Sequence, residues 1–337
     1  MEWKQVLDVL KVHCQGELGN VVMAGAPALP GETLLAQMNY LNETDDSLRR
    51  FLTLEPRAHP AMSVNLLVEP RRPEADAGFI VLQADRAHPM SGSNCICVVT
   101  ALLESGRVPM REGENEIRLD TPAGLITAWA RCRRGRCESV SLRNVPAFVV
   151  ELDRPVQTPA WGAIKVDIAF GGVFYALVDA DQLGLSIEPA DARRLAQAGV
   201  AIKAQLNREL TVSHPDMPTL RGLSYVMFRH PGPDGVLRTC TVLDPGRVDR
   251  SPCGTGSSAN LAVAHARGEL APGQSRVSRS IIGGEFRLDA LEETTVGGRP
   301  AIVPRITGSA WIQGREWLRR DAGDPFPQGF ALPDLGG

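Results

Sequence analysis

The sequence lacks long apolar runs and is poor in aromatic residues. Phe, Trp and Tyr make up only 5% of its 337 residues. No apolar run approaches the roughly 20 residues that a bilayer-spanning helix needs. The first residues, MEWKQVLDVLKVHC, contain no apolar segment of the kind found in secretion signals. We therefore expect a soluble cytoplasmic protein without a membrane partner.

The chain also has no excess of charge of either sign. Its 36 Lys and Arg residues nearly balance 39 Asp and Glu residues, and no basic block marks a nucleic-acid-binding face. An odd number of cysteines, seven, argues against a disulfide framework. Cys132 and Cys137 flank the segment RRGR and could be half of a zinc site. No second Cys or His pair lies at ligand spacing, so the tip of a β-hairpin is favoured and no metal is expected.

Glycine and proline, in contrast, are abundant, with 33 and 25 residues. They separate short β-rich segments, which predicts many strands and turns. The length favours two domains, and we place the crossing between them in the proline-rich segment 152–162. Strands are expected at 20–25, 78–85, 124–132, 147–153, 164–180, 223–230 and 238–244, and helices at 33–52, after Asn94, at 189–210 and at 257–270.

Two segments of the chain share one pattern of residue types. Ser91-Gly92-Ser93 and Cys253-Gly254-Thr255 each place a nucleophile-type side chain, a glycine and a hydroxyl residue before an apolar helix. A helix that is apolar all round must be buried, and its first N–H groups have no partner within the helix. Such N–H groups, together with the helix dipole, favour a carboxylate or phosphate. The pattern predicts two similar halves that together enclose one anionic substrate.

At these motifs the chain resembles the proline racemase superfamily, which includes 4-hydroxyproline 2-epimerases and trans-3-hydroxy-L-proline dehydratases. The resemblance covers nearly the whole chain, from HCQGELGNVVMAG through MSGSN, DTPAGL, VDIAFGGVFYA and DRSPCGTGSSA to DPFPQGF. It implies an α/β (α+β) fold like that of diaminopimelate epimerase. In that fold two pseudo-symmetric domains each wrap a curved sheet around a central helix, and the active site between them uses no cofactor. We expect the first domain at 1–157, joined by the C-terminal segment 315–337, and the second at 158–314.

The resemblance also assigns residues to the site. Cys253 matches one of two facing catalytic residues, and Asp249 matches a carboxylate that helps to set the state of that thiol. Ser91 stands where racemases and epimerases carry their first cysteine. Tyr225 stands roughly where some epimerases place a substrate-contacting histidine. The residues matching those that hold the substrate carboxylate are Gly92 and Ser93 on one side, with Ser93 replacing the usual histidine, and Gly254 and Thr255 on the other.

The chemistry of the two catalytic positions favours dehydration. Inversion of a carbon α to a carboxylate needs an acid and a base on opposite faces. A thiol serves as either, because we expect a helix N-terminus to lower its pKa below the usual value of about 8.5. A serine hydroxyl is a far weaker acid, whereas loss of a 3-hydroxyl needs groups on one face only. We therefore expect a trans-3-hydroxy-L-proline dehydratase, a lyase that forms Δ1-pyrroline-2-carboxylate without a cofactor, with Ser91 and Cys253 catalytic.

Three alternatives stay open. The first is a 4-hydroxyproline 2-epimerase, or an enzyme that performs both reactions. The second is a diaminopimelate epimerase, which the single thiol disfavours. The third is a non-catalytic carboxylate-binding protein, which the joint presence of Asp249 and Cys253 disfavours. The sequence leaves open which of Ser91 and Cys253 removes the Cα proton. The expected partner is a hydroxyproline-type imino acid, and a homodimer is the candidate assembly.

Overall fold

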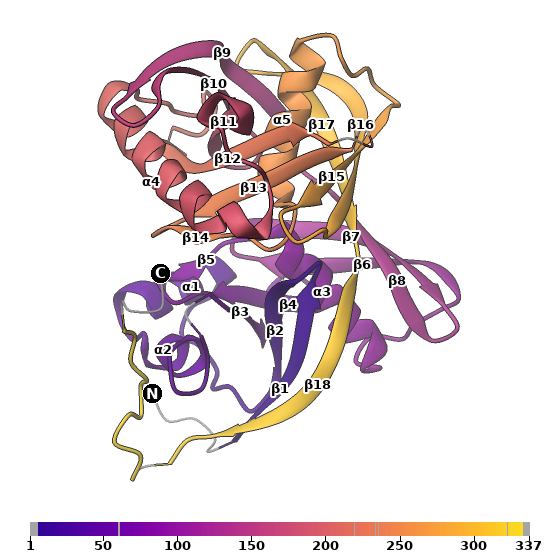
Figure 1. The fold of residues 1–337 in the computed structure, drawn as a ribbon. Helices are drawn as coiled ribbons and strands as arrows, with labels where there is room; N and C mark the ends of the chain where they lie inside the picture. The colour runs from indigo at the N-terminus through magenta and orange to yellow at the C-terminus, as the bar shows by residue number, and fades with distance from the viewer. Residues whose placement is uncertain are drawn as a thin grey trace. The chain divides into compact units, whose positions relative to one another are not determined.

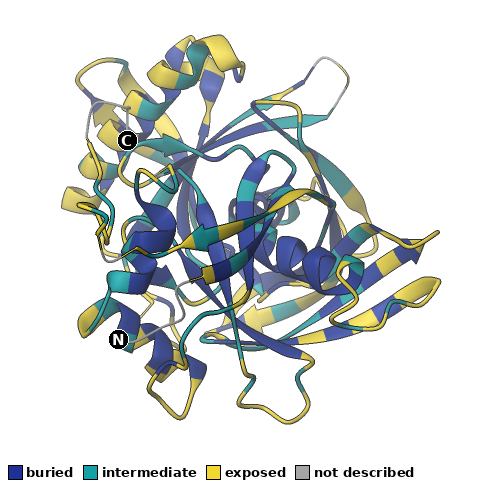
Figure 2. Cartoon of the chain, turned by 90° about the horizontal axis from the view of Figure 1, so that it is seen from below, coloured by how far each residue is buried: buried dark blue, intermediate teal, exposed yellow. Residues whose placement is uncertain are grey.

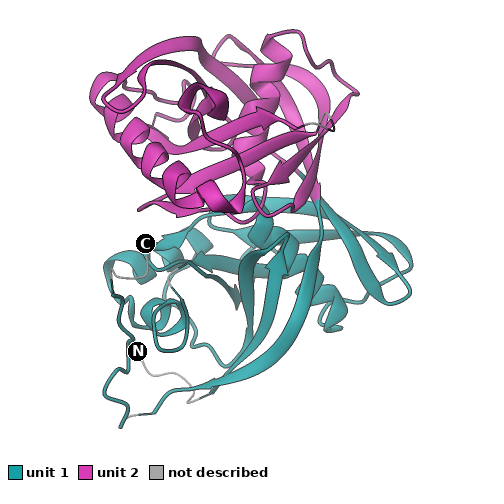
Figure 3. Ribbon diagram, viewed as in Figure 1, with its two compact units in different colours: residues 1–142, 308–337 teal, residues 143–307 magenta. Residues whose placement is uncertain are grey.

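The computed structural model describes residues 6–59, 61–218, 220–232, 234, 236–321 and 323–332. The chain forms two compact units (Figure 3): unit 1 contains Met1–Leu142 and Gly308–Gly337, and unit 2 contains Arg143–Thr307. Strands dominate both units (Figure 1), so the expected mixed α/β fold is confirmed. Among the described residues, no helix is long and apolar enough to cross a membrane.

Unit 1 surrounds helix α3 (Gly92–Glu104) with strands. Every α3 residue from Gly92 to Leu103 except Ser93 is buried, as the dark blue of Figure 2 shows for the molecule's interior. The helix contacts strands on several sides, including β1 and β18, which confirms that the apolar run after Asn94 is a buried helix. The other elements of this unit are β1 (Val6–Cys14), β2 (Glu17–Ala24), α1 (Leu34–Glu43), α2 (Ser47–Thr53), β3 (Ser63–Val68), β4 (Ala77–Leu82), β5 (Ala87–His88), β6 (Gly113–Thr121), β7 (Gly124–Arg133), β8 (Arg136–Arg143, which reaches the boundary of unit 2) and β18 (Ala310–Arg319).

The single helix expected at 33–52 is two helices, so that prediction was partly wrong. Helix α1 begins after the N-cap Thr33, whose hydroxyl accepts from the N–H of Ala36, and it ends at Glu43. The carboxylate of Asp45 accepts a hydrogen bond from the N–H of Ser47, the first residue of α2. Acidic side chains that bond to nearby backbone in this way favour a turn over a continuing helix.

Unit 2 closes its strands into a ring around helix α5 (Gly254–Ala266). Hydrogen-bonded neighbours follow the order β9, β10, β11, β12, β13, β15, β16 and β17, and β17 pairs with β9 again. The elements of this unit are β9 (Ala147–Thr158), β10 (Gly162–Phe170), β11 (Phe174–Asp179), η1 (Ala180–Leu183), η2 (Pro189–Asp191), α4 (Ala192–Glu209), β12 (Leu223–Pro231), β13 (Leu237–Leu243), β14 (Arg247–Val248), β15 (Ser275–Ser280), β16 (Glu285–Val296) and β17 (Arg299–Gly308).

The strands between α4 and α5 are buried on both faces, which explains their nearly continuous apolar sequence. Side chains along a strand alternate between its faces. In β11, Phe174, Ala176 and Val178 join the cluster that contains α4, whereas Tyr175 and Leu177 join the cluster that contains Cys253 and α5. The alternation therefore fixes Tyr175 toward the start of α5.

The domain crossing expected at 152–162 was wrong, because β9 runs through this segment to Thr158. Pro155 pairs with Lys165 of β10, and in the described part of the chain the pairing of β9 with β17 involves only Ala147 and Phe148. Pro155 therefore stands at a strand edge, where proline is tolerated. At Asp153 the backbone is left-handed (φ 53°), beside a bulge in the pairing with β10. The compact units instead divide near 142 and 307, so residue 157, our expected boundary, lies within unit 2.

The segment around RRGR is a hairpin tip, as favoured from the sequence. Strands β7 and β8 pair with Cys132 opposite Cys137. Arg134 and Gly135 turn the chain with φ of 52° and 74°, the left-handed pair that two-residue hairpin loops require. Within the described ranges no three His, Cys, Asp or Glu side chains are grouped so as to hold a metal ion.

Candidate active site

The N-terminus of α5 carries the only predicted catalytic thiol. Cys253 is the N-cap residue, with φ 61° and ψ 102°, a conformation that side-chain-bearing residues rarely adopt. Two short hydrogen bonds hold this turn: the N–H of Cys253 donates to Ser251 Oγ at 3.1 Å, and the N–H of Ser251 donates to Asp249 Oδ1 at 2.8 Å. Asp249, itself buried, thus shapes the backbone that presents the thiol.

The thiol of Cys253 lies in a buried, hydroxyl-lined environment. The hydroxyl of Tyr175 is 3.3 Å from its sulfur, and Thr255 Oγ1 is 3.9 Å away. Burial and, to a smaller extent, the nearby charge of Asp249 raise the pKa of Cys253 to about 11, although hydrogen bonds with Tyr175 and the Gly256 N–H act to lower it. The expected lowering of the pKa by the helix N-terminus was therefore wrong. The charge of Asp249 favours the protonated form of the thiol, and its role in setting the state of that thiol stays a prediction.

Backbone donors at the start of α5 remain available to a ligand. The N–H of Ser257 donates to the carbonyl of Cys253, which is the first regular bond of the helix. For the N–H groups of Gly254 and Thr255, no acceptor is found in the described part of the chain. This is the pair of donors that the sequence assigned to a substrate carboxylate, and their geometry suits an anion.

The N-terminus of α3 also carries a predicted catalytic residue at its N-cap, but with a different backbone conformation from that of Cys253. Ser91 is the N-cap residue, with extended φ and ψ, and the helix begins at Gly92. Ser91 Oγ accepts a 3.0 Å hydrogen bond from Asn94 Nδ2 and lies 3.3 Å from Ser93 Oγ. Asn94, for which the sequence suggested no role, is therefore placed to donate to any negative charge that forms on the Ser91 oxygen. Both serines are partly accessible, whereas Asn94 is buried.

Tyr225 lies beside Tyr175, the tyrosine that contacts the Cys253 thiol. It stands opposite Tyr175 in the parallel pairing of β11 and β12, and the two rings are tilted, with centroids 5.8 Å apart. Tyr225 thus packs against Tyr175, and Tyr175 contacts Cys253. The predicted contact of Tyr225 with substrate stays a prediction. The sequence analysis quoted Tyr175 within FGGVFYA but assigned it no role.

Two glycines make the close packing around α5 possible. A Cβ on Gly171 would lie 2.2 Å from the carbonyl oxygen of Thr255 and 2.5 Å from the N of Ala259. A Cβ on Gly256 would lie 3.0 Å from a ring carbon of Tyr175 and 3.3 Å from the sulfur of Cys253. The two distances at Gly171 are shorter than real Cβ atoms show, and the two at Gly256 are tighter than most real contacts. The FGG and CGTG motifs therefore bring the strand and the helix into direct contact beside the thiol.

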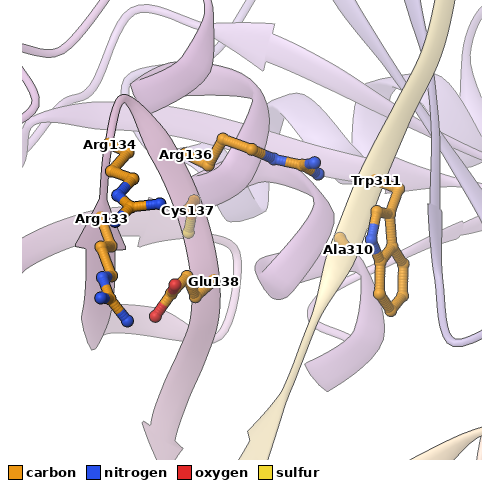
Figure 4. A pocket seen from close by; sticks show the side chains of 7 residues that line it. All are labelled: Arg133, Arg134, Arg136, Cys137, Glu138, Ala310 and Trp311. Carbon is orange, nitrogen blue, oxygen red and sulfur yellow. The ribbon is translucent and has the colours of Figure 1, made fainter.

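A separate cavity of about 490 Å³ lies at the β7–β8 hairpin of unit 1 (Figure 4). It is lined by arginines of the hairpin tip, and Figure 4 shows Arg136 extended toward the strand that carries Trp311. None of the predicted site residues lines this cavity. The predicted site residues lie instead at two helix N-termini, one in each unit, and each is described within its own unit.

These residues support proton transfer at a carbon beside a carboxylate. One helix start offers a thiol with a hydroxyl partner, the other offers a serine hydroxyl with an amide donor, and both offer free N–H groups for an anion. A buried thiol with raised pKa is protonated at neutral pH and so begins as a proton donor.

Comparison with known proteins gives one consistent family. The family model described as proline racemase matches residues 9–331. A 4-hydroxyproline 2-epimerase from Allorhizobium ampelinum is 54% identical over 340 residues, covering 100% of this chain and 98% of the relative. The crystal structure of a hydroxyproline epimerase from Agrobacterium vitis with bound trans-4-OH-L-proline superposes with a TM-score of 0.91 at 53% identity, covering 100% of this chain and 98% of that one. A probable proline racemase from Agrobacterium radiobacter K84, with bound carbonate, gives 0.90 at 53% identity, covering 98% and 97%. The family model matches nearly the whole chain, and the relatives match it over its full length. The chain therefore belongs to the proline racemase family.

Proposed function

We propose that this protein is a 4-hydroxyproline 2-epimerase that inverts Cα of trans-4-hydroxy-L-proline without a cofactor. The observation that carries the proposal is the 54% identity, over the full chain, with relatives named 4-hydroxyproline 2-epimerase. It favours what the sequence analysis held as the first alternative over the dehydratase that it preferred. The site chemistry is compatible, because epimerisation at Cα needs only proton transfer and a seat for the carboxylate.

In this proposal each helix start supplies one proton-transfer group and some of the backbone N–H groups that bind the substrate carboxylate. Cys253 donates a proton to Cα in one direction of the reaction and, as a thiolate, removes it in the other. Ser91 acts on the opposite face, with its oxygen assisted by Asn94 Nδ2 at 3.0 Å. The free N–H groups of Gly254 and Thr255 bind the carboxylate and stabilise the charge that develops when Cα loses its proton.

A second candidate is the dehydration of trans-3-hydroxy-L-proline, and one observation favours it. Ser91 stands where the family's racemases carry a thiol, and among the described residues its polar side-chain contacts are Ser93 Oγ and Asn94 Nδ2. Without a stronger base nearby, its hydroxyl is a poor partner for inversion, whereas dehydration requires acid and base on one ring face. An enzyme that performs both reactions satisfies both observations.

One paired assay separates these functions. The purified protein is incubated with trans-4-hydroxy-L-proline, and cis-4-hydroxy-D-proline is measured by chiral chromatography. In parallel it is incubated with trans-3-hydroxy-L-proline, and pyrroline carboxylate is measured. We expect the first product to form at the higher rate, and Cys253→Ala to abolish it. Formation of pyrroline carboxylate alone would replace the epimerase by the dehydratase, and no turnover of either substrate would leave a carboxylate-binding protein.

A further inference from the structure

The hydroxyl of Tyr175 lies between the Cys253 thiol and Thr255, one of the residues proposed to bind the substrate carboxylate. Its phenolic oxygen is 3.3 Å from the sulfur of Cys253 and 2.8 Å from Oγ1 of Thr255. Thr255 is also one of the two residues whose backbone N–H is free at the start of α5. A single buried hydroxyl therefore contacts both the proton-transfer group and the residue placed at the anion.

The packing holds the ring of Tyr175 in this position. Tyr175 is fully buried in the cluster that includes Met227 and Cys253, and Tyr225 lies against it at 5.8 Å. On the helix side, a Cβ at position 256 would approach the Tyr175 ring to 3.0 Å and the methyl carbon of Met227 to 2.5 Å, so the glycine at 256 leaves the space that these two side chains occupy.

We propose that Tyr175 is the positioning residue of the catalytic thiol: it donates a hydrogen bond to the Cys253 thiolate and takes one from Thr255 when the thiol loses its proton. This role of Tyr175 rests on the proposed function, because the proposed function supplies the identity of the substrate. When the thiol protonates the substrate, the S–H bond of Cys253 breaks and a C–H bond forms at Cα; the reverse step breaks the C–H bond and forms the S–H bond, and around Tyr175 only hydrogen bonds change.

The direction of the bridge follows the protonation state of the sulfur. In the thiol state the S–H group donates to the Tyr175 oxygen, and the phenol donates to Thr255 Oγ1. In the thiolate state both hydroxyl hydrogens turn: Thr255 donates to Tyr175, and Tyr175 donates to the sulfur. Burial and the nearby Cys253 raise the pKa of Tyr175 well above its usual value, so the phenol keeps its proton throughout. Hydrogen bonds to a charged acceptor are stronger than neutral ones, hence the bridge stabilises the thiolate.

The experiment measures the Cys253 thiol directly in the free protein. The rate of alkylation of Cys253 by iodoacetamide is followed from pH 7 to 11 by mass spectrometry of the peptide that contains it. Tyr175→Phe removes the hydroxyl alone, and Tyr40→Phe, a tyrosine of α1 in unit 1, is the matched control. We expect Tyr175→Phe to raise the thiol pKa by about one unit, which slows alkylation below that pKa about tenfold, and Tyr40→Phe to leave the rate unchanged. An unchanged or faster rate in Tyr175→Phe would overturn the inference.

Position 255 gives an independent test if Tyr175→Phe folds poorly. Thr255→Val keeps the shape and removes the hydroxyl, so we expect a smaller slowing of alkylation in the same direction. Thr255→Ser restores the hydroxyl and should recover the parent rate. With 4-hydroxyproline as substrate, Tyr175→Phe should lower kcat about tenfold with KM nearly unchanged. The alkylation result needs no substrate: an altered thiol pKa without epimerisation would refute the proposed function alone, and epimerisation with an unaltered thiol pKa would refute the role of Tyr175 alone.

Discussion

At the scale of single residues, Cys253 combines the thiol that we propose for proton transfer with an unfavourable backbone. Its φ of 61° and ψ of 102° belong to a region in which non-glycine residues cost about 1–3 kcal/mol. The hydrogen bonds through Ser251 and Asp249 hold it there. Strain of this kind is retained where a side chain must be presented in one orientation.

Replacing the residue should therefore separate stability from activity. We expect Cys253→Gly to be more stable than Cys253→Ala by about 1 kcal/mol, because glycine adopts this backbone without strain although it loses more entropy on folding. Neither variant should turn over substrate. Urea unfolding of the two variants, compared under identical conditions, checks the order. Greater stability of Cys253→Ala would show that the conformation at 253 is unstrained.

Ser91 offers the complementary gain-of-function test. In Ser91→Cys, the side chain of Asn94, which donates to Ser91 Oγ at 3.0 Å, would face a thiol, a stronger acid than the hydroxyl by several pKa units. We expect faster epimerisation of 4-hydroxyproline, with a further increase in Ser91→Cys combined with Ser93→His. In deuterium oxide the inverted product should carry solvent deuterium at Cα. Unchanged epimerisation with unchanged dehydration would mean that contacts to the ring, such as Tyr225, set specificity.

At the scale of elements, the packing of α5 on its surrounding strands depends on one glycine. Since a Cβ at 171 would collide with backbone atoms of Thr255 and Ala259, neither of which is the end of a flexible chain, the helix start must shift. We expect Gly171→Ala to cost about 1–3 kcal/mol of unfolding free energy and to reduce activity more than stability predicts. Gly314→Ala on β18, where a Cβ meets nothing within 4 Å, is the matched control. Equal behaviour of both variants would refute the close contact.

A buried ion-pair cluster ties β10, β12 and the end of α5 together. The carboxylate of Asp167 accepts from Arg229, from Arg267 and from the N–H of Asp153. Burial raises the pKa of Asp167, but these donors outweigh it and hold the pKa below its usual value. Because the pKa is depressed in the folded state, the stabilisation is complete above about pH 4 and is lost as the pH falls through the lowered pKa.

The neutral isostere tests this cluster. Asp167→Asn should cost about 2–3 kcal/mol near pH 7, since two guanidinium groups lose a buried acceptor. The difference from the parent should shrink below pH 4 in urea unfolding. Asp179→Asn, which removes a half-exposed partner of Arg229, should cost well under 1 kcal/mol. A pH-independent difference would assign the loss to packing instead of charge.

Elements that depend on local pattern could be predicted from the sequence, and contacts between distant segments could not. The apolar runs after Asn94 and Gly254 predicted two buried helices, and the paired motifs predicted their free N-termini. The contact between Tyr175 and Cys253 joins residues 78 apart in sequence, and no periodicity reports it. The raised pKa of Cys253 likewise depends on tertiary burial. Pro155 contributed to the wrong position of the domain crossing, because proline occurs both in loops and at the edges of sheets.

At the scale of the whole molecule, the chain leaves unit 1 after Leu142 and returns to it at Gly308. The returning segment supplies β18, which pairs with β1 from Val6 to Cys14 and contacts α3. A chain that ends at Thr307 should therefore keep a folded unit 2 and lose ordered unit 1. Limited proteolysis should leave a resistant fragment near 143–307 and digest residues 1–142. Protection of both units would show that β18 is dispensable for unit 1.

The late return of β18 also has a consequence for synthesis on the ribosome. At a typical rate of 5–20 residues per second, the whole of unit 2 is made between the two parts of unit 1, a delay on the order of ten seconds. During that time β1 has an unpaired edge, and open strand edges recruit other chains. A crowded polysome would thus place many nascent copies with the same open edge side by side, and a chaperone that covers β1 would act before translation is complete.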